Sequence, residues 1–271
     1  SDAKDVIHVP KGGMLAGILN ELGLKSPSSL KLSGTLGVSD FTTLRNIQSL
    51  EHLDISRVNL SVLPTEAFLE CTNIKSVILP NTLTAIGTQA FWGSSLVSIS
   101  IPASVEEIRG SAFFGCSSLK TVTFEKGSKL KTVAGFSHCT SLTTIEIPAS
   151  VETIGQYAFN DCTSLHTVTF EKGSKLKTIG SDVFLNCTSL TMIEIPASVE
   201  TIEDQAFEGC SLLATVTFEK GSQLKTVDGF SNCTALTTVD MSACTQVTRI
   251  EYRAFYEDSK LQLFKIGTRT P

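Results

Sequence analysis

Acidic side chains are the first candidates for chemistry, because paired carboxylates can act as general acids and bases or bind metal ions. Glu146, Glu194 and Asp240 occupy equivalent positions in a recurring strand-like pattern, each two repeats from the next. Strands in a sheet lie about 4.8 Å apart, so these backbones should be about 10 Å apart. That is too wide for shared metal ligation, and it reaches the upper limit of about 9.5 Å between the carboxylates of an inverting glycosidase. We therefore interpret the three carboxylates as a solvated column.

Other catalytic patterns are missing from the sequence. It contains no nucleophile elbow, phosphate-binding loop, dinucleotide fingerprint or zinc-protease motif. The four histidines are scattered along the chain, at His8, His52, His138 and His166. We predict a protein that is not an enzyme and that carries no metal or cofactor.

Eight cysteines raise the possibility of disulfides or a zinc site. All but Cys244 share one place in the repeat, three residues before a leucine (an isoleucine after Cys71). In stacked repeats their Cβ atoms should be about 4.8 Å apart, beyond the mean of about 3.8 Å in real disulfides. Zinc is not favoured either, because there is no C-x-x-C pair and only Cys139 has a neighbouring histidine. We predict a ladder of buried free thiols.

A phrase of about two dozen residues recurs along most of the chain, and it is clearest in Leu142–Phe159, Leu165–Phe184 and Leu190–Phe207. Such a period is typical of a solenoid, in which each unit packs only against its neighbours. We expect about ten coils of 22–25 residues, plus a degenerate one near Leu30–Leu36. Coils with FEKGS alternate with coils with IPAS, which indicates duplication of a two-coil block. The apolar residue that ends each strand marks the period, at Ile55, Leu79, Ile101, Phe124, Ile147, Phe170, Ile195, Phe218, Met241 and Ile266.

Within one coil the pattern predicts two strands and a turn. Alternation of apolar and polar residues over 144–147 is typical of a half-buried strand, and Pro148 ends it. The apolar pair Val151 and Ile154 can form a second, brief strand, and 155–159 is long enough only for a single helical or 3₁₀ turn. Two coils are shortened by two residues at this turn, and each carries a glycine there, Gly135 or Gly229.

The recurring pattern A-F-x-x-C-x-S-L-x-x-[IV]-x-[IF]-P-x-S-V-x-x-I resembles the BspA-like class of leucine-rich repeats, over roughly 50–266. The resemblance implies a mostly β, right-handed superhelix with a parallel sheet on its concave face. It also implies a place on a bacterial surface or in a secreted protein, and roles in adhesion or host-protein binding without catalytic residues. Family members differ in their partners, so the partner does not carry over.

The N-terminal segment departs from the repeat. Apolar residues in 13–22 recur on one helical face, and a second helix should begin at Asp40 as N-cap and run through Leu44 and Ile47. We expect residues 1–48 to form a cap with the degenerate first coil, and 49–271 to form the repeats of the same domain. The start, Ser1–Asp5, resembles a mature or engineered terminus, and no C-terminal cap is expected at Thr270–Pro271.

Composition narrows the possible partners. A net charge of −5 is too mildly acidic to indicate a nucleic acid or an anionic membrane. No apolar run approaches the roughly 18 residues that would span a bilayer. We predict a monomer outside the cell or at its surface, whose partner is an extracellular or host protein, or a glycan.

The candidate binding face is the exposed side of the strands. Its residues are Ser98 and Ser100, then Thr121, Thr123, Thr144, Glu146, Thr167, Thr169, Met192, Glu194, Thr215, Thr217, Thr238 and Asp240. These hydroxyls and carboxylates could hold an extended protein or glycan. The alternative is a set of cross-strand threonine ladders that simply suits a solvated sheet.

A second candidate surface is an apolar stripe. In three consecutive coils the residue after the A-F pair is Leu69, Trp92 or Phe114, and the next two coils have Ser137 and Asn160 there. If these side chains point outward they form an anchor for a partner; the alternative is that they tuck under the adjoining turn. We thus predict a non-enzymatic binding module, with a stiff spacer that presents another domain as the alternative.

Overall fold

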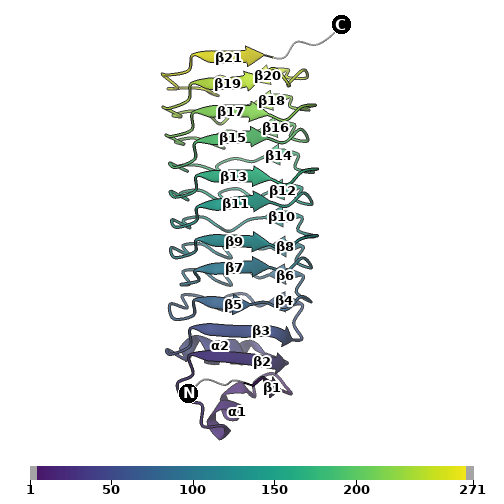
Figure 1. Ribbon diagram of the computed structural model, residues 1–271, viewed down its shortest axis with the longest axis vertical. Helices are drawn as coiled ribbons and strands as arrows, with labels where there is room; N and C mark the ends of the chain where they lie inside the picture. The colour runs from purple at the N-terminus through teal and green to yellow at the C-terminus, as the bar shows by residue number, and fades with distance from the viewer. Residues whose placement is uncertain (1–4, 267–271) are drawn as a thin grey trace.

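A computed structural model describes residues 5–266. They form a parallel β-solenoid of about eleven turns with few helices. Figure 1 shows the turns stacked in one column, with α1 (Leu15–Glu21) at one end and β21 at the other. The fold class predicted from the sequence is therefore confirmed. Residues 1–4 and 267–271 lie outside the described residues. The prediction of an uncapped C-terminus at Thr270–Pro271 concerns residues in the second of these ranges.

Two columns of strands run the length of the solenoid. The wider column forms three four-stranded parallel sheets, in the order β1-β2-β3-β5, β7-β9-β11-β13 and β15-β17-β19-β21. Its strands are β1 (Ile7–Val9), β2 (Ser29–Gly34), β3 (His52–Val58), β5 (Ser76–Ile78), β7 (Ser98–Ile101), β9 (Thr121–Phe124), β11 (Thr144–Ile147), β13 (Thr167–Phe170), β15 (Met192–Ile195), β17 (Thr215–Phe218), β19 (Thr238–Met241) and β21 (Leu263–Ile266).

The narrower column is one nine-stranded parallel sheet. Each strand has two residues, as expected of the brief second strand in each coil. They are β4 (Val62–Leu63), β6 (Ala85–Ile86), β8 (Glu107–Ile108), β10 (Thr132–Val133), β12 (Thr153–Ile154), β14 (Thr178–Ile179), β16 (Thr201–Ile202), β18 (Thr226–Val227) and β20 (Arg249–Ile250).

Alternation along each wide strand separates the core from the surface. In β11, Ile145 and Ile147 are buried, whereas Thr144 and Glu146 are exposed. Pro148 follows and is buried at the strand end. The half-buried strand predicted from the period-2 pattern is therefore present.

The turn after each narrow strand differs from a continuous helical turn. One hydrogen bond from the Ala158 N–H to the Gly155 carbonyl closes it, at 3.1 Å, but Tyr157 has a left-handed φ of 61°. The N–H groups of Phe159 and Asp161 then donate to the next coil, at Val183 and Leu185. Because alternate N–H groups serve the neighbouring coil, the segment cannot use them all within a helix.

The two shortened coils make a tighter corner at a glycine, as the sequence predicts. Gly135 has φ of 87° and Gly229 has φ of 90°. A Cβ on Gly229 would lie 2.5 Å from the Glu203 carbonyl oxygen and 2.9 Å from Ala206. Only glycine combines this backbone conformation with so close an approach of the preceding coil.

Replacement of Gly229 by alanine is expected to lower the free energy of unfolding by about 2–4 kcal/mol, since it adds backbone strain and a clash. Gly221 is a matched control, because its φ is 81° but nothing lies within 4 Å of an added Cβ. Urea denaturation of Gly229→Ala and Gly221→Ala separates the clash from the strain. Equal losses in the two variants would show that the close approach costs nothing.

Two ladders of side chains fill the core between the strand columns. Consecutive phenylalanine rings from Phe68 to Phe255 stack with interplanar angles of at most 16°, and Phe41 and Phe264 meet the two ends edge-on. All eight cysteines are buried free thiols, as predicted. The thiols are also donors, which the prediction did not include: six of them bond the phenylalanine carbonyl of the preceding coil, for example Cys187 to Phe159 at 3.2 Å.

The N-terminal helices pack against the first turns, with Leu15 and Leu19 in the core. Only part of the predicted helical face is buried, since Met14 and Leu22 are exposed.

The predicted N-cap is wrong. In α2 (Val38–Asn46) the N-cap is Gly37, and Asp40 is the third helical residue. The buried Asp40 carboxylate accepts the Gly37 N–H at 2.8 Å, and it accepts the Gly13 and Leu15 N–H groups at 2.7 and 3.1 Å. It thus satisfies donors at the starts of both helices, which a residue at N3 can do by reaching backward.

Candidate functional site

The predicted binding residues lie together on the outer side of the wide column, which we call the strand face. The predicted residues on β7 to β15 are all exposed. The four on β17 and β19 are only half-buried, namely Thr215, Thr217, Thr238 and Asp240. Equivalent positions of neighbouring strands lie in register: Thr144 is opposite Thr167, and Glu146 is opposite Thr169. The face therefore carries two rows of hydroxyl and carboxylate groups.

The strand face is not one continuous sheet. Strands are fully paired within each two-coil block, as β11 is with β13 and β15 with β17. Between blocks the pairing is weaker: β9 and β11 share one register pair, and β13 and β15 belong to different sheets. A further break separates β5 from β7.

Proline contributes to these openings. Within a block, the N–H after the strand donates to the previous strand end, as Glu171 does to the Ile147 carbonyl at 2.9 Å. At the next block boundary the equivalent residue is Pro148 or Pro196, which has no N–H to donate. One cross-strand hydrogen bond is therefore unavailable at each of these two boundaries.

The β9–β11 boundary and the β13–β15 boundary each hold a shallow cleft. The first seam cleft, between β9 and β11, has a volume of about 230 Å³, and the second, between β13 and β15, about 350 Å³. The larger cleft is at the boundary that lacks strand pairing. Equivalent residues line both clefts: Phe124 and Phe170, Pro148 and Pro196, Glu146 and Glu194, and Glu171 and Glu219.

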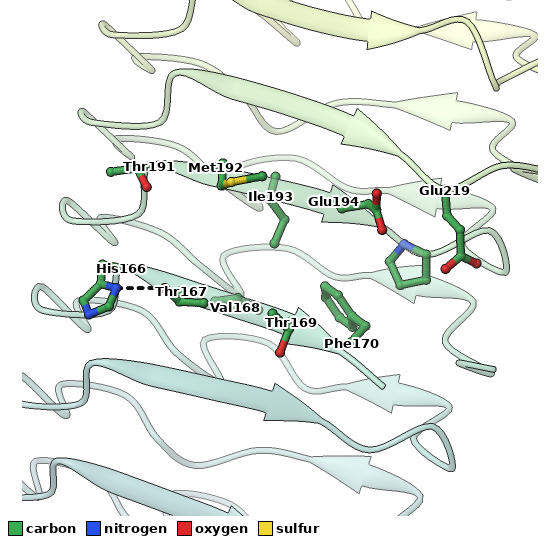
Figure 2. A pocket seen from close by; sticks show the side chains of 11 residues that line it. His166, Thr167, Val168, Thr169, Phe170, Thr191, Met192, Ile193, Glu194 and Glu219 are labelled. Atoms are coloured by element: carbon green, nitrogen blue, oxygen red, sulfur yellow. Dashed lines mark hydrogen bonds between the residues drawn. The ribbon is translucent and has the colours of Figure 1, made fainter. Parts of the chain in front are cut away.

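Figure 2 shows the arrangement in the second seam cleft. Glu194, Glu219 and Phe170 lie at the end where the strands point, and His166 lies at the opposite end. The His166 ring is 2.8 Å from the Thr167 hydroxyl. Glu219 accepts the Ala197 N–H at 3.2 Å, and Glu171 accepts the Ala149 N–H at 3.1 Å in the first cleft. These backbone contacts hold one carboxylate at the edge of each cleft.

The three carboxylates of the predicted acidic column have different surroundings. Glu146 and Glu194 line the clefts, but Asp240 accepts hydrogen bonds from the Ser242 hydroxyl and N–H, at 2.6 and 3.0 Å. These bonds lower the pKa of the Asp240 carboxyl. Among residues 5–266, no three His, Cys, Asp or Glu side chains are grouped so that they could hold a metal ion.

The predicted apolar stripe is half-buried, between the two orientations considered from the sequence. Trp92 and Phe114 contact each other with ring centroids 4.6 Å apart, and Phe114 contacts His138 at 5.0 Å. Leu69 is in the coil before Trp92. The stripe thus continues to His138, which could not be recognised from the repeat because His138 is one position further along its coil.

Polar contacts fix His138 at the end of the stripe. Its ring lies 2.9 Å from the Ser137 hydroxyl and 3.2 Å from the Asp161 carboxylate. Ser137 and Asn160 are buried and hydrogen-bonded to each other. The Ser137 hydroxyl therefore lies between the His138 ring and the Asn160 side chain.

The paired strand columns, the regular coil length and the repeated core positions define a leucine-rich repeat protein. Residues 39–135 and 133–262 match the BspA type leucine rich repeat region. The chain belongs to the BspA type leucine-rich repeat family, and the resemblance inferred from the sequence is confirmed.

Solved structures with the same fold include a leucine-rich repeat protein from Bacteroides ovatus, which is 22% identical with a TM-score of 0.53; the match covers 97% of this chain and 82% of that one. The pneumococcal vaccine antigen PcpA is 21% identical with a TM-score of 0.50, over 88% of this chain and 62% of that one. A leucine rich cell surface protein from Faecalibacterium prausnitzii is 23% identical with a TM-score of 0.42, over 86% and 76%. No curated protein matches the sequence. Within residues 5–266, no helix is long and apolar enough to cross a bilayer.

Proposed function

We propose that the chain is a non-enzymatic binding module, secreted or displayed at a cell surface, that holds an extracellular or host protein, or a glycan, through its strand face. The proposal rests on the exposed rows of threonine and glutamate from β9 to β15, which are interrupted by the two seam clefts. Hydroxyl and carboxylate groups on an exposed sheet can exchange water for hydrogen bonds to a ligand at little cost. The family supports a place at the surface, and we propose that the chain acts there as a monomer.

Screening the purified chain against glycan and extracellular-protein arrays should identify a ligand, and an arginine on the face should then prevent its capture. Thr167→Arg places a bulky side chain on β13, in the middle of the face. Thr153→Arg is the control, since Thr153 is exposed on the narrow column at β12. We expect Thr167→Arg to reduce capture at least about tenfold and Thr153→Arg to leave it unchanged. Equal capture by both variants would place the ligand elsewhere.

The apolar stripe is a second surface that the same screen can test. Trp92→Ala combined with Phe114→Ser removes its two aromatic rings, and half-buried aromatic residues are common anchors in protein interfaces. If this double variant no longer captures the ligand, whereas Thr167→Arg captures it as well as the wild type does, the ligand binds the stripe.

A structural spacer is the alternative function, and the continuous core supports it. One cluster of buried residues extends from Ile7 to Cys244 without a break, so the chain is suited to act as a stiff rod. Failure of both arrays to give a ligand that depends on either surface would favour the spacer.

A further inference from the structure

The two seam clefts are copies of one site. Each is formed where a TVTF strand meets the next strand, and each has phenylalanine, proline and two glutamates at matching positions. Repetition of the same residues predicts that both clefts accept the same chemical group. Because two coils separate them, the clefts should be about 10 Å apart along the solenoid.

The lining of the clefts favours a long cationic side chain. Half-buried Phe124 and Phe170, with the proline of each cleft, provide apolar surface. Two equivalent carboxylates border each cleft, Glu125 is a third in the first cleft, and neither Lys nor Arg is among the described lining residues. Lysine and arginine side chains suit such a surface, since the methylene stem packs on apolar groups while the charged end meets a carboxylate.

The spacing of the clefts indicates which backbone conformation the ligand should have. A polyproline II chain has three residues per turn and a rise of about 3.1 Å, so equivalent side chains recur every 9.3 Å or so. That repeat is close to the separation of about 10 Å between the clefts. In a fully extended strand, side chains on the same face recur about every 6.7 Å and would not fit both clefts.

We propose, resting on the function proposed above, that the seam clefts together bind a basic segment of a partner protein, in which Lys or Arg recurs at every third residue of an extended, polyproline-like chain. One cation enters the cleft with Glu146 and Glu171, and the next enters the cleft with Glu194 and Glu219. Linking the two contacts raises the affinity above that of either one, since the second side chain binds from a high local concentration.

The next block boundary provides an internal comparison on the same face. Between β17 and β19 three register pairs close the sheet, and Phe218 is buried. Ser242 replaces the proline there and occupies Asp240 with two hydrogen bonds. Asp240 is therefore a carboxylate on the strand face that lies outside the two clefts.

The test is fluorescence anisotropy with labelled peptides of about four Lys-Pro-Pro triplets, which form polyproline II chains with the required repeat. The wild-type chain should bind this peptide at least about tenfold more tightly than a Lys-Pro repeat of equal charge, whose spacing does not match the clefts. Glu146→Gln with Glu194→Gln should weaken binding about tenfold, each single variant should fall between, and Asp240→Asn should bind like the wild type. Raising the salt concentration should reduce the binding of the wild type.

Other outcomes would overturn the proposal. One is that a Glu-Pro-Pro peptide binds as tightly as the Lys-Pro-Pro peptide, and another is that the double glutamine variant keeps the wild-type affinity. A third is that Asp240→Asn loses as much affinity as the double glutamine variant. Tighter binding of a glucosamine oligomer than of the Lys-Pro-Pro peptide would identify a glycan site instead. Thermal unfolding of each variant checks that the fold is intact. If an array ligand is blocked by Thr167→Arg but is unaffected by the double glutamine variant, the proposed function stands and this inference fails.

Discussion

Replacing Phe159 with alanine should lower the free energy of unfolding by about 3–5 kcal/mol, the usual range for loss of a buried aromatic side chain. The ring is fully buried, and its centroid is 5.5 Å from the ring of Phe136 and 5.5 Å from that of Phe184. Each coil of a solenoid contacts only its neighbours, so the surrounding core has little freedom to close the cavity. Urea denaturation followed by circular dichroism measures the loss.

Phe255 is the matched control, because it belongs to the same ladder but is only half-buried near its end. Phe255→Ala should cost less than half as much. Phe159→Ala should also separate the transitions of the two ends, with Trp92 fluorescence reporting the N-terminal coils and circular dichroism the whole chain. Equal losses at both positions, with coincident transitions, would argue that the ladder does not carry stability from coil to coil.

Most of the coil geometry follows from local patterns and could therefore be predicted. Alternation places Ile145 inside and Thr144 outside whatever the curvature of the solenoid, because side chains in a strand point to opposite faces. Repetition at a constant period then places equivalent residues in register, which is why Cys162 and Cys187 could be expected in one buried ladder. Gly135 could be recognised as a corner from the shortened spacing alone.

Other features depend on contacts between coils that the sequence does not reveal directly. Asp40 resembles an N-cap locally, but its carboxylate also serves Gly13, and this contact displaces it to the third position of the helix. The seam clefts follow partly from Pro148 and Pro196, which were visible in the sequence. The effect of these prolines is evident only once the structure shows that the equivalent residue, Glu171, donates its N–H to the preceding coil. His138 joins the stripe through a left-handed turn, with φ of 60°.

Alkaline solution should destabilise the protein steeply, because its thiols are buried. Burial raises the pKa of the Cys162 and Cys210 thiols to about 12, and it raises the pKa of Cys187 as well. In the unfolded chain a cysteine has a pKa of about 8.5. Between these values the unfolded chain loses protons that the folded chain keeps, so unfolding becomes more favourable as pH rises.

The stability contributed by each such thiol is fully present below about pH 8.5 and is lost as the pH rises towards the folded pKa, at up to about 1.4 kcal/mol per pH unit. Urea denaturation at several pH values from neutral to about 10.5 measures this slope, and the loss should be large because several thiols contribute together. Cys187→Ala isolates one of them: it should be less stable at neutral pH, since the bond to the Phe159 carbonyl is lost, but its slope should be shallower.

Alkylation of the native protein gives an independent measurement of the same property. At pH 8 a thiol with a pKa near 12 is ionised to only about one part in ten thousand, whereas an unfolded cysteine is ionised to roughly a quarter. Iodoacetamide should therefore modify Cys162 and Cys210 slowly in the folded chain and rapidly in urea. Parallel pH slopes for the wild type and Cys187→Ala, together with rapid native alkylation of Cys210, would contradict a protonated, enclosed thiol ladder.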